Sequence, residues 1–292
     1  MNRGLPLTPM VSPKKKKSNK KRLFDILLSI PYLAVLFIFI VLPMFILLLN
    51  SFNSESNHGF DIQFTGNHYV NIFADGFFLK PLLNSLYYSL IATAIVLVIG
   101  YPLAYFISRK KESTQAILLS LITVPMWINM LIRLHALKQS MELFIGNSFT
   151  GSGVAIVASM VYAYLPFMVL PIHSVLAKFD NNLYESAADL GANKIKTFFK
   201  VVIPLSLSGV MSGIIMVFLP AMTSIIFTST NFFGTNTAMI GQLIEESIKR
   251  KLYGGYGYGA AISILLSILM ILLVLLMRRV ERKTQGGGQD EE

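Results

Sequence analysis

The residues that could carry chemistry in this chain are few and widely spaced. The chain has no cysteine, which excludes disulfides, thiolate nucleophiles and cysteine-based metal sites. Arg133, His135 and His173 lie in or beside strongly apolar stretches, where an ionisable group is a functional candidate. Each is close enough to the end of its stretch for the side chain to reach an interface. We therefore favour structural roles for these three residues, and the sequence predicts no catalytic or metal site.

Hydroxyl and aromatic side chains offer a second kind of chemistry, a polar path for a solute. Ser and Thr inside an apolar stretch can line such a path or hydrogen-bond neighbouring membrane helices. A lone Trp can anchor a helix at a membrane interface or pack in the core. The candidate substrate-path residues are Trp127, Arg133, Thr223, Ser224 and Thr228.

Phosphate chemistry is not expected in this chain. No G-x-x-x-x-G-K-[ST] sequence occurs in it. The nearest candidate, Gly191 to Lys194, lacks the second glycine and the Lys-Ser/Thr pair that cradle phosphates. The sequence therefore predicts no ATP-binding site and no cofactor in this chain.

The composition places these residues in a membrane protein. Of 292 residues, 54% are hydrophobic and only 14% are charged, and the mean hydropathy is +0.61. Soluble domains carry nearer a quarter charged residues. The net charge of +10 does not indicate nucleic-acid binding, because the basic residues gather beside apolar segments and not on an aromatic-bearing surface.

Six apolar stretches are long enough to cross a bilayer core of about 30 Å as helices. The sequence thus predicts an all-α membrane protein with six transmembrane helices in residues 23–277. A basic disordered tail is predicted before it (residues 1–22), and a second tail after it (278–292). The predicted spans are Phe24–Leu49, Leu82–Ile107, Ala116–Leu134, Val154–Leu176, Leu205–Thr228 and Ala260–Met277.

Basic residues predict the orientation of these spans. Lys and Arg are enriched in the N-terminal tail, after the second span, between the fourth and fifth spans, and after the sixth. Cytoplasmic loops carry such an excess, so both termini and these loops are expected in the cytoplasm. The 229–259 loop is a mild exception to this rule, because it should be external but contains Lys249, Arg250 and Lys251.

One polar stretch, Ala177–Pro204, interrupts the apolar spans. Asn182 to Glu185 forms a capping-box pattern that predicts a short helix from Leu183 to about Leu190. Gly191 should end this helix in a left-handed conformation. Asn193 or Ala192 should start a second helix, Lys194 to about Val202, closed by Pro204. Taken alone, this pattern fits either a docking element or an amphipathic hairpin packed on its own bundle.

The same stretch resembles the EAA signature of binding-protein-dependent ABC importer permeases. Glu185-Ser186-Ala187, then Gly191, then Val201-x-Ile203-Pro204 match that signature in spacing, with Ser in place of the second Ala and Val and Ile in place of Ile and Leu. The resemblance implies the type I ABC importer permease fold, and it implies that the loop couples to a separate ATPase. The residues implied in this coupling are Glu185, Ser186, Ala187, Ala188, Asp189, Gly191 and Pro204.

A wider resemblance, over most of residues 24–277, is to the permeases of spermidine/putrescine importers, and most to the first permease of that system. Leu165–Ile172, Pro204–Gly209, Pro125-Met126-Trp127 with Arg133, and Ile240–Ile244 carry it. One departure is that Thr223-Ser224 follows Pro220-Ala221-Met222, where a Gly-Glu pair is common in that branch. Importers of thiamine, iron, sulfate or molybdate share much of this architecture and remain alternatives.

The resemblance also implies partners and a location. Two ATPase subunits, a second permease that is a paralogue of this chain, and an extracytoplasmic substrate-binding protein or domain are expected in a bacterial plasma membrane. The rival interpretation, a secondary transporter, predicts inverted repeats and paired acidic residues inside the membrane. The sequence offers only Asp25, near a membrane edge, and no convincing repeat.

Overall fold

The computed structural model describes residues 29–53, 64–74, 76–180, 186–187, 189–228, 237–250 and 255–286. It divides into two compact units, residues 1–49 and residues 50–292, and each is described by itself. The part of the chain that it describes is helical, apart from an isolated bridge between Asn53 and Phe64. The predicted N-terminal tail lies outside the described residues.

The helix of the first unit runs through a wide π turn. It is continuous from Ser29 to Ser51 and contains the π segment η1 (Phe37–Val41), followed by α2 (Leu42–Ser51). The Leu42 amide donates to the carbonyl of Phe37, five residues earlier. Pro43 follows directly, and a wider turn lets the chain pass a residue that has no amide proton and crowds the preceding carbonyls. The helix therefore continues through a proline that would otherwise break it.

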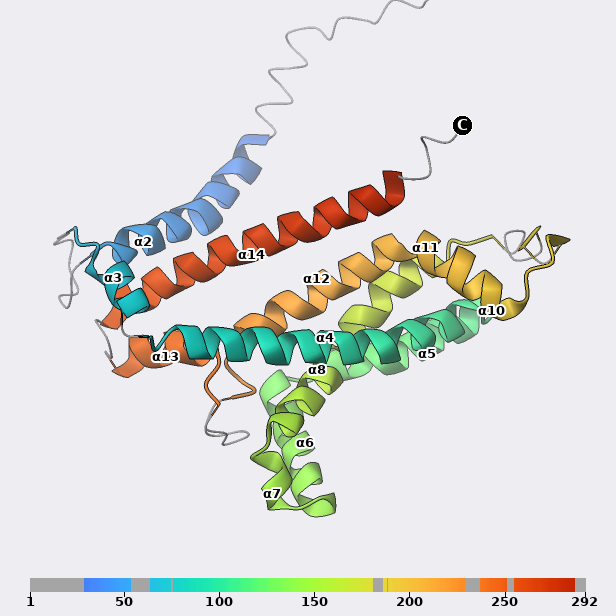
Figure 1. The fold of residues 1–292 in the computed structure, drawn as a ribbon, viewed down its shortest axis with the longest axis horizontal. Coiled ribbons are helices and arrows are strands. Elements are labelled where there is room, and N and C mark those ends of the chain that lie inside the picture. The colour runs from blue at the N-terminus through green and yellow to red at the C-terminus, as the bar shows by residue number, and fades with distance from the viewer. Residues whose placement is uncertain are drawn as a thin grey trace, which may run out of the picture. The chain divides into compact units, whose positions relative to one another are not determined.

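Three helices form the centre of the second unit (Figure 1). They are α4 (Leu79–Ser108), α8 (Gly153–Leu176) and α12 (Leu207–Thr223), and each packs against the other two. Small residues allow the close approach of α12 to α8. A Cβ built on Gly209 would lie 2.9 Å from the carbonyl oxygen of Pro171, and one on Gly213 would lie 2.6 Å from the Met168 sulfur.

A second cluster of buried side chains lies where five helices of the unit pack against one another. The amphipathic helix α13 (Ile240–Arg250) packs against α14 (Gly255–Gly286), α4 and α12, and α14 also packs against α3 (Asn67–Ala74). Tyr258, Phe218 and Met222 are among the side chains that this packing buries completely or almost completely. The helix α14 continues past Met277, where the last span was predicted to end.

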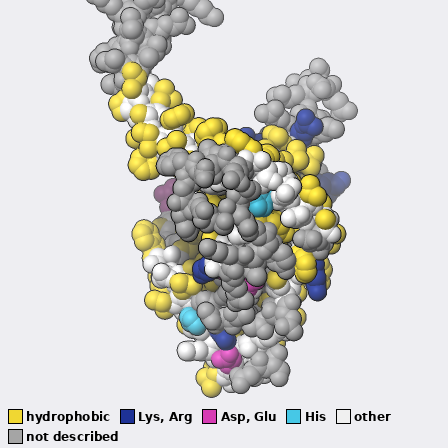
Figure 2. Space-filling view, turned by 90° about the vertical axis from the view of Figure 1, so that its left-hand side faces the viewer, with side chains coloured by type: hydrophobic (Ala, Val, Ile, Leu, Met, Phe, Trp, Pro, Cys, Tyr) yellow, Lys and Arg dark blue, Asp and Glu magenta, His cyan; other side chains and the backbone are white. Residues whose placement is uncertain are grey.

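The described surface suits a membrane. Viewed from the side shown in Figure 2, hydrophobic side chains cover much of the described surface and charged ones are scattered. Four helices are long and apolar enough to cross a bilayer, or six if each of two bent helix pairs is one span. The four are Ser29–Ser51, Leu79–Ser108, Gly153–Leu176 and Gly255–Arg279. The count of six predicted from sequence thus holds when the bent pairs are included.

The two bent pairs correct the predicted boundaries of the fifth span, where α12 runs from Leu207 to Thr223 and does not extend to Thr228, and of the third span. The third span is not a continuous helix from Ala116 to Leu134. It consists of α5 (Glu112–Thr123) with the 3₁₀ turn η2 (Val124–Trp127), and then α6 (Met130–Phe144), at 98° to each other. Ile128 is extended, and the Asn129 side chain caps α6 by accepting a bond from the Leu131 amide. The cap and the extended residue start a new helix, which a search for apolar runs does not detect.

Candidate functional site

The turn around Gly191 has the predicted form. Gly191 has a φ of +76°, a conformation that favours glycine. The Ala192 amide donates to the carbonyl of Ala187 over 3.0 Å, which is the six-to-one bond of a Schellman C-cap. The prediction that Gly191 ends the first helix is therefore confirmed. Glu185, Ala188 and the proposed capping box at 182–185 lie outside the described residues.

The second helix also begins where the sequence predicts. The Asn193 side chain accepts from the Lys196 amide over 2.8 Å and caps α10 (Lys194–Thr197). The prediction that Pro204 closes this helix is wrong, because α10 continues through the π segment η3 (Phe198–Val202) into α11 (Ile203–Leu205). As in the first unit, the wide turn ends two residues before a proline, here with the Ile203 amide bonded to the Phe198 carbonyl.

One side of this segment is fixed on the end of α4. The Phe198 ring meets the rings of Tyr101 and Tyr105 edge-on, with centroids 5.7 and 5.0 Å away. The Tyr101 hydroxyl hydrogen-bonds the Ser206 hydroxyl at 2.7 Å, and Val202 is fully buried. Edge-on aromatic pairs add to the free energy gained by burial. These contacts tie the segment directly to α4.

The other side carries apolar side chains with no cover in the described chain. Leu190 is 87% exposed, Ile195 70% and Phe199 63%. Lys194, Lys196 and Lys200 are exposed among them, as are Ser186 and Asp189, while Ala187 is buried. Apolar patches rimmed by polar residues mark interaction surfaces. We call this set of exposed residues, Leu190, Lys194, Ile195, Lys196, Phe199 and Lys200, the docking face.

The turn between α4 and α5 is tied to α8 near the docking face. A ring nitrogen of His173, near the end of α8, lies 2.9 Å from the Gln115 side-chain oxygen. The Gln115 amide nitrogen donates to the carbonyls of Ser108 and Lys110, over 3.2 and 2.7 Å. These bonds hold three elements together, and they support the structural role expected for His173.

Arg133 is buried and does not reach an interface, contrary to the sequence-based expectation. Its Nη1 donates to the carbonyl of Pro125 over 3.0 Å, and its guanidinium carbon lies 5.5 Å from the centre of the Tyr162 ring. The bond spans the break between η2 and α6. A guanidinium that holds a carbonyl across a break and stacks on an aromatic ring stabilises the bend. Its Nε has no hydrogen-bond partner among the described residues.

Tyr164 joins several of the predicted substrate-path residues, and sequence reasoning did not select it. The Tyr164 ring lies 5.7 Å from that of Phe227, and Ser224 and Arg133 lie near its hydroxyl. The adjacent Thr228 is fully buried, and its hydroxyl has no partner within the described chain. A tyrosine in the middle of an apolar span was the available signal.

The remaining two predicted path residues are not part of this cluster. Trp127 is 88% exposed, so it does not pack in the core of the described chain. Thr223 is also exposed, and its hydroxyl donates to the Leu219 carbonyl of its own helix over 3.1 Å. Both side chains face the surroundings of this chain.

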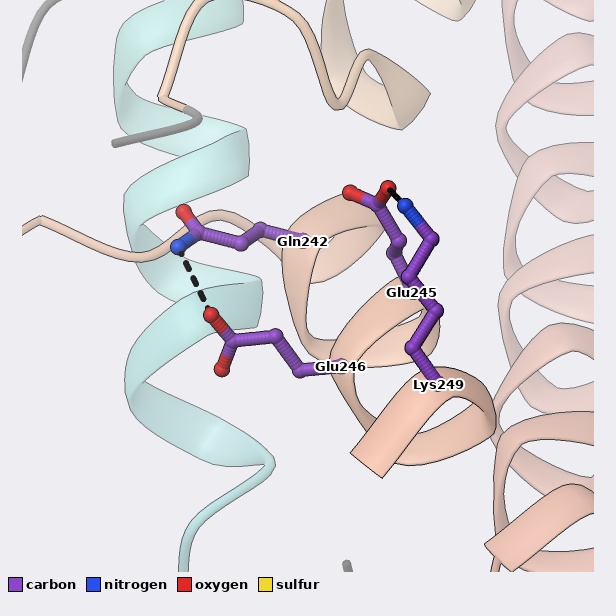
Figure 3. Close-up of polar contacts among 4 residues, drawn as sticks. All are labelled: Gln242, Glu245, Glu246 and Lys249. Atoms are coloured by element: carbon purple, nitrogen blue, oxygen red, sulfur yellow. Dashed lines mark hydrogen bonds and ion pairs between the residues drawn. The ribbon is translucent and has the colours of Figure 1, made fainter. Parts of the chain in front are cut away.

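The end of α4 away from the docking face carries polar contacts with α13. The Asn84 side chain donates to the Ala238 carbonyl over 3.0 Å, and the Ser85 hydroxyl accepts from the Ile240 amide over 2.8 Å. Figure 3 shows two further pairs on α13, Gln242 with Glu246 and Glu245 with Lys249. No group of three His, Cys, Asp or Glu that could hold a metal ion occurs among the described residues.

Comparisons with known proteins agree with this geometry. The family described as "Binding-protein-dependent transport system inner membrane component" matches residues 97–286. The spermidine/putrescine transport system permease protein PotB of Escherichia coli K12 is 34% identical over 249 residues, covering 80% of this chain and 89% of that protein. The corresponding protein of Haemophilus influenzae is 32% identical over 249 residues, covering 80% and 86%.

Solved structures show the same fold. A bacterial ABC transporter involved in the import of alginate matches with a TM-score of 0.71 and 16% identity, over 90% of this chain and 96% of that one. The inward-facing MetNI methionine ABC transporter matches with a TM-score of 0.53 and 17% identity, over 70% and 95%. The fold is therefore that of ABC importer permeases.

Proposed function

The chain belongs to the binding-protein-dependent transport system inner membrane components, and from this premise we propose that it is a permease subunit of an ABC importer for polyamines. It is a multi-pass membrane protein that forms half of a translocation pathway for spermidine or putrescine. The substrate assignment rests on the 34% identity to a spermidine/putrescine permease over 80% of the chain.

The permease works with partners that supply recognition and energy. An extracytoplasmic binding protein delivers the polyamine to this chain and to a second, paralogous permease. Two ATPase subunits bind ATP and magnesium on the cytoplasmic side, where both termini of this chain also lie. This chain breaks no covalent bond itself, in keeping with the lack of a phosphate-binding loop in its sequence.

The docking face transmits the ATPase cycle to the membrane helices. Exposed Leu190, Ile195 and Phe199 fit a groove on the ATPase, as apolar side chains of a short helix commonly do. The opposite side of the segment presses Phe198 against α4, and α12 follows immediately after α11. ATP binding draws the two coupling loops of the permease pair together, the pathway opens outward, and hydrolysis resets it.

The remaining coupling residues have supporting roles in this scheme. Gly191 shapes the turn between the two short helices, and Pro204 lies within the helix that leads back into the membrane. The EAA-like signature assigns contacts with the ATPase to Glu185, Ser186, Ala187, Ala188 and Asp189. The small side chains among these allow a close approach to the partner.

The polar cluster around Tyr164 is the proposed part of the substrate path within the spans. Ser224, Thr228 and Tyr164 offer hydroxyl groups to a passing amine. Arg133 holds the bend of the third span from within. Exposed Trp127 and Thr223 face the second permease or lipid.

Reconstitution tests this proposal. The chain is purified with its co-purifying subunits, placed in liposomes, and given candidate solutes with the binding protein. We expect spermidine or putrescine to stimulate ATP hydrolysis and to accumulate in the vesicles. If only thiamine, iron, sulfate or molybdate stimulated ATP hydrolysis, that solute would be the substrate and the polyamine assignment would be wrong. Transport by the purified chain alone, driven by an ion gradient without an ATPase, would overturn the ABC mechanism.

A further inference from the structure

The helix α13 lies at the end of α4 opposite the docking face (Figure 1). Asn84 and Ser85, in the first two turns of α4, bond to the chain at Ala238 and Ile240, whereas Tyr101 and Tyr105 contact Phe198. Ser85 and Tyr101 are separated by a helical rise of about 24 Å. With the docking face in the cytoplasm, α13 therefore lies toward the outer side, where a solute enters.

Two side chains of α13, one turn apart, leave hydrogen-bond acceptors without donors. Gln242 is only 9% exposed, and its Nε2 donates to Oε1 of Glu246 over 3.1 Å. Only the NH₂ end of an amide can donate to a carboxylate, so the amide oxygen of Gln242 is left over. This buried oxygen has no partner within the described chain. A buried acceptor without a donor costs free energy.

The neighbouring acidic residue on α13, Glu245, differs from Glu246 because its carboxylate has a basic partner among the described side chains. Glu245 pairs with Lys249, one turn further on. Glu246 is half-buried and forms no ion pair with the side chains that the structure describes, which do not include that of Arg250 one turn further on, and its second oxygen has no hydrogen bond with them. Figure 3 shows Gln242 and Glu246 extending together, away from the Glu245–Lys249 pair. Glu246 and Gln242 thus place a negative charge and two unpaired acceptors side by side within the described chain, and the amide oxygen of Gln242 is buried.

We propose that Glu246 and Gln242 form a binding site for a primary ammonium group of the transported cation, at the outer part of the path. This inference rests on the proposed function, which supplies an aliphatic amine as substrate. An ammonium group has three donors and a positive charge, so it can bond the carboxylate and the open amide oxygen together. A magnesium or calcium ion would need more oxygen ligands than these two side chains provide.

A purely structural role for the Gln242–Glu246 bond makes a different prediction. Glutamine at position 246 can still accept the Gln242 bond with nearly the same shape, but it has no charge. A structural role is therefore preserved in E246Q, whereas an ammonium site is weakened. The matched control is E245Q, which removes a neighbouring charge that faces the other way and already has a partner.

The test uses the reconstituted complex with its ATPase and binding protein. Uptake of radiolabelled spermidine and putrescine is measured and divided by the ATP hydrolysed. We expect E246Q to lower this ratio about tenfold, the loss of one charge-assisted hydrogen bond, and E245Q to leave it within about twofold. Equal ratios in E246Q and the wild type overturn the site, while a wild type that imports neither polyamine overturns the proposed function itself.

A second variant decides the question if the E246Q complex does not assemble. Q242M removes the open amide oxygen and retains the charge of Glu246 and the size of the side chain. We expect uptake per ATP to fall about threefold, since a neutral hydrogen bond contributes less than a charged one. Assembly is checked by the thermal melting of the purified complex. An unchanged ratio in an assembled Q242M complex also overturns the site.

Discussion

The two ends of α4 differ in how they hold their neighbours. Near the docking face, Tyr101 and Tyr105 of α4 contact the Phe198 ring edge-on, and the hydroxyls of Tyr101 and Ser206 hydrogen-bond each other. At the α13 end, side chains of α4 bond to backbone groups far away in the sequence, and the buried amide oxygen of Gln242 on α13 has no hydrogen-bond partner within the described chain. The first arrangement suits the transmission of force through a rigid contact, and the second suits transient contact with a polar solute.

Gly209→Ala probes the close packing of α12 against α8 toward the docking-face end. The new Cβ would lie 2.9 Å from the Pro171 carbonyl oxygen, a backbone atom that cannot rotate away. We expect a loss of about 2–3 kcal/mol in the free energy of unfolding, as in an overpacked core. Thermal unfolding in detergent measures it. Gly66→Ala is the control because nothing lies within 4 Å of its Cβ, and an equal loss in both variants would contradict the close packing.

Removal of the aromatic contact tests the same end with a functional measurement. Phe198→Ala removes a half-buried ring that two tyrosines contact, with an expected loss of about 2 kcal/mol and weaker coupling of ATP hydrolysis to uptake. Phe199→Ala removes an exposed ring of the docking face.

The two phenylalanine variants should therefore differ in their effects on ATPase association and on stability. Phe199→Ala is expected to weaken ATPase association with little change in the melting temperature of the chain, while Phe198→Ala lowers both. Pull-down of the ATPase and thermal melting measure the two effects. If Phe199→Ala destabilised the chain as much as Phe198→Ala, the division into a fixed side and a docking face would be wrong.

Ser85→Ala gives a smaller expected effect at the α13 end. It leaves the Ile240 amide without its acceptor at a buried position, with a cost of about 1–2 kcal/mol. The control is Ser120→Ala, because the exposed Ser120 hydroxyl bonds only a carbonyl of its own helix. Thermal unfolding compares them, and a Ser120→Ala loss as large as that of Ser85→Ala would argue against a specific tie between α4 and α13.

Local signals in the sequence predicted local structure well. The Gly191 turn and the Asn193 cap depend on hydrogen bonds within a few residues, so residue type and spacing are sufficient to find them. The apolar lengths of the spans predicted the membrane fold for a similar reason. Glycine, asparagine and apolar runs determine the conformation of the residues next to them in the sequence.

The features that the sequence did not predict depend on distant partners or on backbone adjustment. The guanidinium of Arg133 is buried against the Pro125 carbonyl and the Tyr162 ring. Tyr164 is a candidate because Ser224 lies beside it in the fold. The helix passes Pro204 through a π turn, although proline usually ends a helix. Neither kind of information is present in the local pattern.

The most direct test of the coupling role is Gly191→Pro in the reconstituted complex. Proline fixes φ near −65°, which is incompatible with the φ of +76° at Gly191 but affects no packed neighbour. Gly76→Pro is the matched control at the other end of α4, because Gly76 has a φ of +65° and equally open surroundings.

The measurement is ATP-driven polyamine uptake together with ATPase association. We expect Gly191→Pro to lower both at least about tenfold, equivalent to about 1.4 kcal/mol or more of lost docking free energy, while Gly76→Pro retains ATPase association. Full uptake and full association in Gly191→Pro would contradict the assignment of residues 177–204 as the coupling element.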